Sequence, residues 1–108
     1  GTMGGDGQPQ TQAVIASRVV DFGMSPKDAV AAPRFLYGRT WGDNSTTLKL
    51  EGRVRPEVGK RLAELGHSVE YLDNFTETMG HAGAIVVKED RSVEAATDPR
   101  SDGLALTL

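Results

Sequence analysis

Hydrophobic residues recur with helical spacing in the first third of the chain, and glycine and proline mark where the helices end. Residues 9–22 carry an apolar face with a 3.6-residue period, and Gly23 is the expected stop. A second, short helix has Ser25 as its N-cap and Pro26 at its first position, and Pro33 ends it. The apolar face of the first helix is formed by Val14, Ile15, Val19 and Phe22.

The remainder of the chain alternates one more helix with extended segments. Residues 56–65 form the third predicted helix, and Gly66 is its C-terminal cap. The last two extended segments flank a short polar turn at residues 89–91, which predicts an antiparallel hairpin. Strand-forming residues predict strands at 35–37, 47–50, 69–72, 82–88 and 92–97.

Helices early in the chain and a hairpin late in the chain predict an α+β fold, in which helices pack on a mainly antiparallel sheet. A doubly wound parallel sheet is not favoured by this order of elements. The 108 residues are enough for one domain, or for part of a larger one, and too few for two.

Charge and composition exclude several classes of function. The 12 Lys and Arg against 15 Asp and Glu give 12 − 15 = −3, and no basic stripe is present that would indicate nucleic-acid binding. The chain has no cysteine, which excludes disulfides, zinc-thiolate sites and thiol nucleophiles. No apolar run approaches the roughly 20 residues of a membrane span. We expect no cofactor, no nucleic-acid partner and no membrane-spanning segment.

Glycines are concentrated at the start of the chain, directly before the first predicted helix. Gly4 and Gly5 can direct backbone N–H groups into one concavity, and the positive end of the helix adds to the field there. Such a site could hold an anion or a developing oxyanion. The residues match neither the phosphate-binding loop nor the dinucleotide fingerprint. From the pattern alone, a purely structural turn is somewhat favoured over an oxyanion site.

Three further residues carry side chains that take part in chemistry in other proteins. Thr2 is not expected to be a nucleophile, because it leads into glycines and Gly1 precedes it. His67 and His81 are the only histidines, and no carboxylate lies at a metal-ligand spacing from either. His67 is expected at the exposed C-terminus of a helix, and His81 on a loop before a strand, where it would orient the backbone.

The segment Asp98-Pro99-Arg100-Ser101-Asp102-Gly103 places an arginine two residues from a carboxylate on either side. Asx turns and an arginine fork account for every residue type in it. We therefore predict a structural role for Asp98, Arg100 and Asp102.

Taken together, six segments identify a family. They are residues 1–12 (GTMGGDGQPQTQ), 20–24 (VDFGM), 29–34 (AVAAPR), 65–67 (LGH), 79–82 (MGHA) and 98–103 (DPRSDG). Their order and spacing resemble the C-terminal part of the gamma-glutamyltranspeptidase family, and the resemblance spans essentially the whole chain. It implies an N-terminal nucleophile hydrolase with an αββα fold, made as one precursor that cleaves itself into a large and a small subunit. The new N-terminal threonine of the small subunit takes the gamma-glutamyl group from glutathione or a similar amide and transfers it to water, an amino acid or a peptide.

The resemblance also implies roles for individual residues. Gly4 and Gly5 match the adjacent glycines that bind substrate through the oxyanion, whereas Met3 and Asp6 depart from the residues common beside that pair. The nucleophilic threonine and the main substrate-binding residues would precede Gly1. Residues 1–108 are thus expected to be a single or partial domain from the C-terminal part of the small subunit, inactive alone. The expected partners are the rest of the small subunit, the large subunit and a small gamma-glutamyl substrate, and the isolated piece is expected to self-associate.

Two alternatives stay open at this point. One is an acylase of the same superfamily that acts on cephalosporin side chains or glutaryl amides. The other is a non-catalytic assembly module in which the glycines merely turn the chain. The family suggests a periplasmic or secreted location, with the cytoplasm as the alternative.

Overall fold

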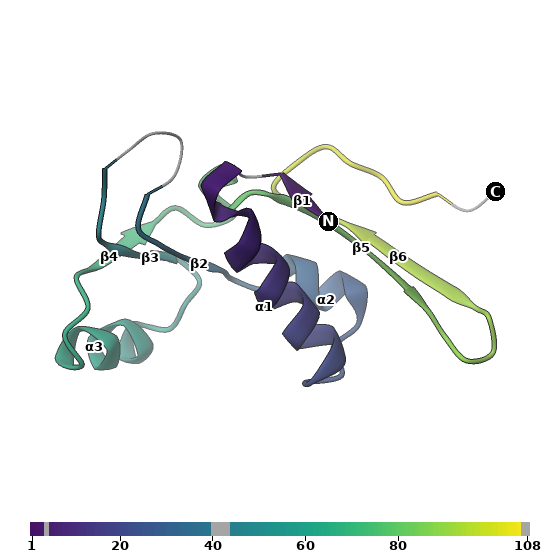
Figure 1. The fold of residues 1–108 in the computed structure, drawn as a ribbon, viewed down its shortest axis with the longest axis horizontal. Coiled ribbons are helices and arrows are strands. Elements are labelled where there is room, and N and C mark those ends of the chain that lie inside the picture. The colour runs from purple at the N-terminus through teal and green to yellow at the C-terminus, as the bar shows by residue number, and fades with distance from the viewer. Residues whose placement is uncertain (4, 40–43, 107–108) are drawn as a thin grey trace.

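The computed structural model describes residues 1–3, 5–39 and 44–106. Its strands form two three-stranded sheets, with orders β1-β5-β6 and β2-β3-β4. Figure 1 shows an elongated molecule, 46 × 27 × 20 Å, with α3 at one end and the β5–β6 hairpin at the other. The elements are β1 (Thr2–Met3), α1 (Gln8–Val20), α2 (Pro26–Ala31), β2 (Phe35–Tyr37), β3 (Leu48–Glu51), α3 (Pro56–Glu64), β4 (Val69–Leu72), β5 (His81–Val87) and β6 (Val93–Thr97), with 3-10 turns at Gly5–Gly7 and Glu77–Met79.

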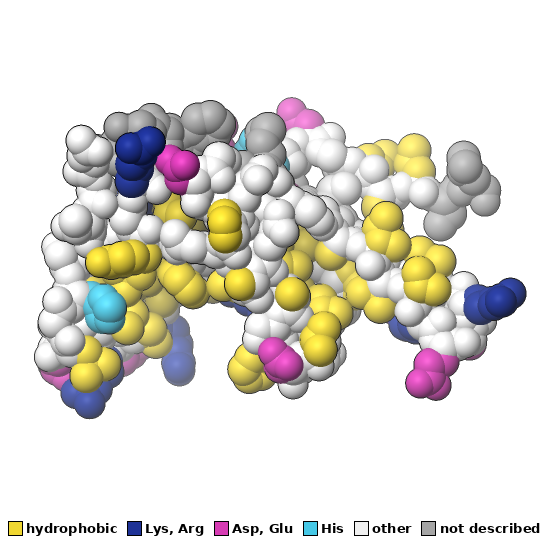
Figure 2. Space-filling model, viewed as in Figure 1, with side chains coloured by type: hydrophobic (Ala, Val, Ile, Leu, Met, Phe, Trp, Pro, Cys, Tyr) yellow, Lys and Arg dark blue, Asp and Glu magenta, His cyan; other side chains and the backbone are white. Residues whose placement is uncertain are grey.

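The first sheet is covered by helices on one face and exposes hydrophobic residues on the other. Helices α1 and α2 bury a small core against the covered face, formed by Ile15, Ala29, Val30 and Ala82. Because side chains alternate along a strand, Ile85 and Val87 point to the opposite face, and Val93 pairs with Val87 there. Their exposed fractions are 72 %, 67 % and 55 % for Ile85, Val87 and Val93. Hydrophobic side chains are visible along this hairpin in Figure 2.

The second sheet contains a parallel pair that the sequence did not indicate. Strands β2 and β3 are antiparallel, but β3 and β4 are parallel, with Leu48 opposite Val69. Parallel neighbours require a crossover connection, and α3 supplies it between β3 and β4. The fold is α+β with a mainly antiparallel arrangement, as predicted, and among the described strands the β3–β4 pair is the exception.

The predicted helices are confirmed with small changes at their ends. The apolar face assigned to the first helix was wrong at Phe22, which lies beyond the end of α1 and is 76 % exposed. The helix ends earlier because the amides of Asp21 and Phe22 both donate to the Ser17 carbonyl, after which Gly23 reverses the chain at φ +64. None of the described helices is both long and apolar enough to cross a membrane.

Replacing Ser25 by alanine is expected to destabilise the protein by about 1 kcal/mol. The Ser25 hydroxyl accepts a hydrogen bond of 3.1 Å from the Asp28 amide, one of the free donors at the start of α2. Chemical denaturation of the Ser25→Ala and Ser25→Asn variants would measure this effect. Asparagine caps helices as well as serine does, so an equal loss in both variants would contradict the capping role.

Candidate functional site

We call residues 5–7, the 3-10 turn directly before α1, the glycine turn. Gly4 lies outside the described residues. Gly5 is exposed and has φ +54, a backbone conformation that favours glycine. Gly7 is buried at the N-terminus of α1, and an added Cβ there would lie 2.9 Å from the Leu36 Cδ1 atom. Glycine is therefore favoured at position 5 by its conformation, and a side chain at position 7 would require Leu36 to shift.

Three polar side chains from the start of α1 fix the helix side of the glycine turn. The Gln8 side-chain amide donates to the Thr2 carbonyl at 2.9 Å, which ties α1 back to β1. The Gln10 amide donates to the Tyr37 carbonyl at 2.9 Å and accepts from the Tyr37 amide at 2.8 Å. The buried Thr11 hydroxyl donates to the Met79 carbonyl at 3.3 Å. The first turn of α1 is thus bonded to three other segments.

The strand side of the turn is fixed by β5. Thr2 lies opposite Ala82 in the ladder, and Met3 lies opposite His81. The Thr2 hydroxyl also donates to the His81 carbonyl at 3.1 Å. Both ends of the glycine turn are therefore held by hydrogen bonds within the described part of the chain.

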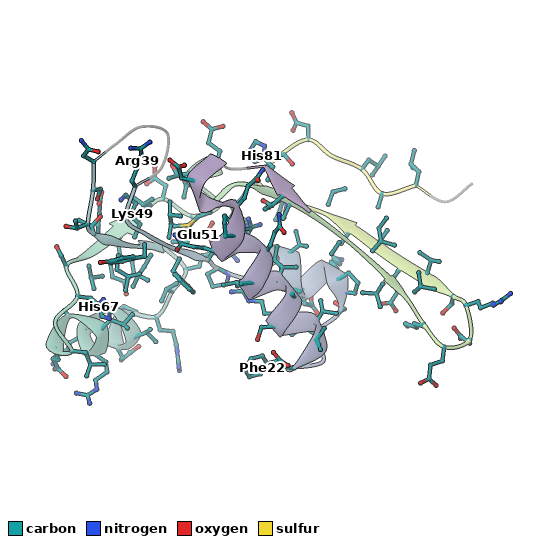
Figure 3. All side chains as sticks on the ribbon, in the orientation of Figure 1. Phe22, Arg39, Lys49, Glu51, His67 and His81 are labelled. Carbon is teal, nitrogen blue, oxygen red and sulfur yellow. The ribbon has the colours of Figure 1, made fainter. Side chains whose placement is uncertain are left out.

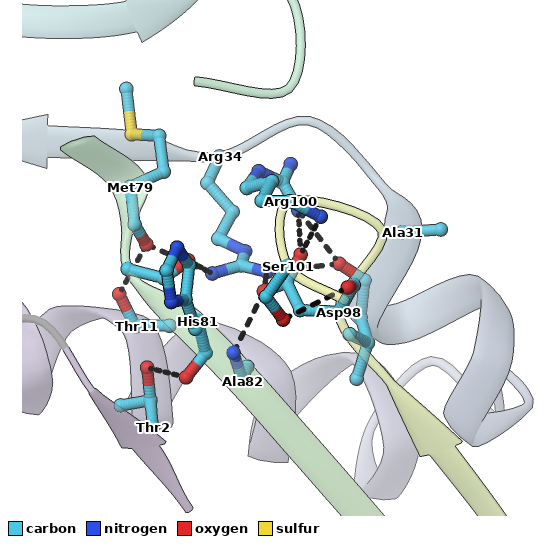
Figure 4. A network of polar contacts seen from close by, with 12 residues as sticks. Thr2, Thr11, Ala31, Arg34, Met79, His81, Ala82, Asp98, Arg100 and Ser101 are labelled. Carbon is cyan, nitrogen blue, oxygen red and sulfur yellow. Dashed lines mark hydrogen bonds and ion pairs between the residues drawn. The ribbon is translucent and has the colours of Figure 1, made fainter. Parts of the chain in front are cut away.

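Four buried charged residues, which we call the charged cluster, join the two sheets. Figure 4 shows three of them, Arg34, Asp98 and Arg100. Arg34 precedes β2, Glu51 ends β3, and Asp98 and Arg100 follow β6. Their exposed fractions are 1 % for Arg34, 0 % for Glu51, 1 % for Asp98 and 8 % for Arg100. Arg34 is paired with Asp98, and Arg100 donates to the Glu51 oxygens at 2.8 and 2.6 Å and to Asp98 Oδ1 at 2.9 Å.

The charged cluster also satisfies the C-terminal carbonyls of α2, together with Arg18 and Arg53. Helix ends leave carbonyls unpaired and carry partial negative charge, so guanidinium groups are suitable partners. Arg34 and Arg100 each donate to the Val30 carbonyl at 3.1 Å. The remaining bonds are from Arg18 to the Ala29, Ala32 and Pro33 carbonyls, from Arg53 to Ala31, and from Arg100 to Ala32.

The electrostatics of the cluster keep Asp98 and its two arginine partners charged. Burial raises the pKa of Asp98, but hydrogen bonds from Arg34, from the Arg100 and Ala82 amides and from the Arg100 guanidinium outweigh it and hold the pKa below its usual value. Burial lowers the pKa of Arg34, while bonds to Glu51 and Asp98 leave the pKa of Arg100 raised despite its burial. An arginine remains charged in either case.

The structure brings together only part of the predicted Asp98–Asp102 group. The Arg100 amide donates to Asp98 Oδ1 at 3.0 Å, which is the expected Asx turn. Asp102 is exposed and lies outside the charged cluster. Arg34 and Glu51 are partners that sequence reasoning missed. Glu51 ends the short strand Leu48–Glu51, in which leucines alternate with charged residues, so its charge did not stand out.

The two histidines lie in different parts of the molecule (Figure 3). His67 is exposed after α3, as expected. His81 begins β5 and is partly buried, and its Nε2 atom has no hydrogen-bond partner within the described residues. No group of three His, Asp or Glu side chains in the described ranges could hold a metal ion.

Helices packed against sheets in this arrangement occur in N-terminal nucleophile hydrolases. The crystal structure of cephalosporin acylase from Bacillus halodurans matches with a TM-score of 0.83 and 28 % identity, covering 96 % of this chain and 18 % of that one. The family model described as Gamma-glutamyltranspeptidase matches residues 1–108, and the chain belongs to that family.

Two curated relatives are similar in sequence. One is "Oxamate amidohydrolase proenzyme" from Klebsiella pneumoniae subsp. pneumoniae, 55 % identical over 105 residues, covering 97 % of this chain and 20 % of that protein. The other is "Glutathione hydrolase-like YwrD proenzyme" from Bacillus subtilis, 43 % identical over 108 residues, covering 100 % of this chain and 21 % of that protein. The chain thus spans about one fifth of the length of the relatives it matches.

Proposed function

We propose that the protein containing this chain cleaves amides through an acyl-enzyme, and that the glycine turn stabilises the oxyanion of the tetrahedral intermediate. A threonine outside this chain would attack the amide carbon, and the carbonyl electron pair would move to oxygen. Collapse of the intermediate would break the C–N bond and release the amine with a proton, and water or an amine acceptor would then take the acyl group. The family membership supports the reaction class.

The anchoring of the glycine turn is the observation that carries this proposal. Donors to an oxyanion act best when they are held in place before the charge develops. Gly5 has a positive φ in the 3-10 turn that leads into the 13-residue helix α1, and hydrogen bonds from Gln8, Thr11 and Thr2 fix the segments on either side. The positive end of the α1 dipole adds to the stabilisation of a negative charge.

Substitution of the glycines in the full-length protein tests the proposal. Gly4→Pro removes one backbone N–H and should lower kcat roughly a hundredfold or more. Gly5→Ala keeps the backbone N–H but strains the backbone, because alanine disfavours a positive φ. The strain would displace the N–H donor, and we expect kcat to fall at least about tenfold. The readout is steady-state hydrolysis measured together with the thermal unfolding midpoint.

Gly23→Ala is the matched control for Gly5→Ala. Gly23 has φ +64, close to the +54 of Gly5, and an added Cβ would meet nothing within 4 Å at either position. Both changes therefore impose similar backbone strain, but only one falls in the glycine turn. Equal kcat values in the two variants would support the alternative of a non-catalytic turn.

For the substrate, we propose a gamma-glutamyl amide such as glutathione, with oxamate as a second candidate. The second candidate is favoured by the 55 % identity to the oxamate amidohydrolase proenzyme. The similarity to a cephalosporin acylase favours a third candidate substrate class, the cephalosporin side chains or glutaryl amides of the alternative acylase. Comparison of kcat/KM for gamma-glutamyl-p-nitroanilide, oxamate and a glutaryl anilide on the full-length protein would distinguish them.

We also propose that residues 1–108 are one part of a larger fold, the C-terminal part of a small subunit, and that other parts of the same precursor cover the exposed face of the β5–β6 hairpin. Exposed Ile85, Val87 and Val93 support this, because contiguous apolar patches usually mark contact surfaces. The coverage of about one fifth of each relative supports it too.

A further inference from the structure

Both ends of the glycine turn are anchored on one short segment, residues 79–83. On the strand side, Met3 and Thr2 pair with His81 and Ala82 in the β1–β5 ladder. On the helix side, Thr11 lies one turn into α1 and donates to the Met79 carbonyl at 3.3 Å. The position of the turn therefore depends on the position of this segment.

The charged cluster holds the same segment from the opposite side (Figure 4). The Arg34 Nη1 group donates to the Met79 carbonyl at 2.8 Å and to the Gly80 carbonyl at 3.1 Å. Asp98 Oδ2 accepts from the Ala82 amide at 2.8 Å and pairs with Arg34. The Met79 carbonyl is thus shared by Arg34 and Thr11, which connects the cluster directly to α1.

We propose that Arg34 and Asp98 are positioning residues for the glycine turn, and that Thr11 transmits their effect to α1. The proposal rests on the oxyanion role proposed above for the turn. An oxyanion donor must be held within about 0.5 Å of its productive geometry, and its supports must themselves be rigid. Arg34 is 1 % exposed and bonds to Met79, Gly80, Val30 and Asp98, so its planar guanidinium is fixed on several sides.

Kinetic and stability measurements distinguish a residue that positions the glycine turn from one that only stabilises the fold. A stabilising contact would lower the unfolding midpoint and leave the kinetics of the folded enzyme unchanged. A positioning contact for an oxyanion donor acts in the transition state, so its loss lowers kcat while KM stays nearly constant. Thr11 is the best residue to change, because its hydroxyl can be removed without leaving a buried charge unpaired.

The test compares Thr11→Val and Thr11→Ser in the full-length protein. Valine keeps the shape of threonine and removes the donor, whereas serine keeps the donor. We expect Thr11→Val to lower kcat at least about tenfold with KM within twofold of the parent, and Thr11→Ser to restore most of the loss. The substrate is whichever of the three amides named above the parent protein cleaves fastest.

A matched control lies elsewhere in the chain. The Thr97 hydroxyl also donates to a backbone carbonyl, that of Gly103 at 2.9 Å. Thr97 lies opposite Gly83 in the β5–β6 ladder, but Thr97→Val keeps the backbone pairing and removes only a hydroxyl that does not bond to residues 79–83. We expect Thr97→Val to leave kcat unchanged.

Hydrogen exchange provides a readout that needs no substrate. Peptides covering residues 1–12 should exchange faster in Thr11→Val than in Thr11→Ser or Thr97→Val. Equal exchange in the three variants would overturn the proposal, as would equal kcat values for Thr11→Val and Thr11→Ser. Arg34→Lys keeps the positive charge but loses the planar guanidinium with its several donors, so residues 1–12 should exchange faster in this variant too. Exchange equal to that of the parent protein would contradict the role of Arg34.

Failure of this proposal differs from failure of the proposed function. If Gly4→Pro and Gly5→Ala abolish activity but Thr11→Val does not alter kcat, the proposed function stands. The positioning role of Arg34, Asp98 and Thr11 is then wrong. If the glycine substitutions leave activity unchanged while exchange in residues 1–12 still responds to Thr11→Val, the anchoring exists but the turn holds no oxyanion.

Discussion

Replacing Arg100 by methionine is expected to lower the free energy of unfolding by about 3–5 kcal/mol, the usual effect of removing one member of a buried ion pair. Arg100 donates to both Glu51 oxygens, to Asp98 and to the Val30 and Ala32 carbonyls. Methionine fills part of the volume but supplies none of these donors. Glu51, which has no exposed surface, would keep its bonds to Arg53 and the Arg34 amide as its remaining partners.

The control for this prediction is Arg61→Met, which breaks an exposed ion pair. Arg61 and Glu64 are 3.2 Å apart, and their side chains are 68 % and 49 % exposed. Such pairs contribute little, so we expect a change of less than about 0.5 kcal/mol. Chemical denaturation of both full-length variants measures the difference, and similar losses for Arg100→Met and Arg61→Met would show that the charged cluster contributes no special stability.

Asp98→Asn is expected to destabilise the protein at neutral pH by about 2–4 kcal/mol, between the loss of a charged hydrogen bond and the loss of a whole buried partner. Asparagine keeps the size of the side chain and one acceptor oxygen. It removes the negative charge that compensates Arg34 and Arg100, and it cannot accept all the bonds from Arg34, Arg100 and the Ala82 amide at once.

The destabilisation by Asp98→Asn should shrink as the pH falls. The folded pKa of Asp98 is lowered, so its stabilising contribution is complete above the unfolded value of about 3.9 and is lost as the pH falls through the lower folded value. The parent should therefore lose stability below about pH 4 more steeply than the variant. Denaturation curves at pH 7 and pH 3 measure this; a constant difference between parent and variant at the two values would contradict the assignment.

Local features of the structure could be predicted from the sequence because their determinants are close in the chain. The α2 helix is specified by Ser25 and Pro26 at its start, and the β5–β6 hairpin by a polar turn between two hydrophobic runs. Both need only residues within a few positions of each other. The parallel pairing of β3 and β4 depends on how α3 folds back, which local patterns do not specify.

The charged cluster could not be predicted for the same reason. Arg34 and Asp98 are separated by 64 positions, and Arg100 and Glu51 by 49. The sequence showed Arg100 only beside its neighbouring carboxylates, so a self-contained loop was the natural interpretation. The anchoring of the glycine turn was also hidden, although Thr11 lies four positions before Ile15 on the buried face of α1, and a polar residue in that apolar stripe was the available signal.

The capping of α2 has a consequence for the order in which the chain folds during synthesis. A helix of six residues is too short to persist alone, and its C-terminal carbonyls depend on arginines that include Arg53 and Arg100. The ribosome adds Arg100 about seventy residues after the helix itself has been made. Helix α2 therefore stays incomplete until this last contributor has emerged, and so does the support that Asp98 gives to the glycine turn. Folding of this region therefore requires residues far along the chain and is not completed by residues 26–31 alone.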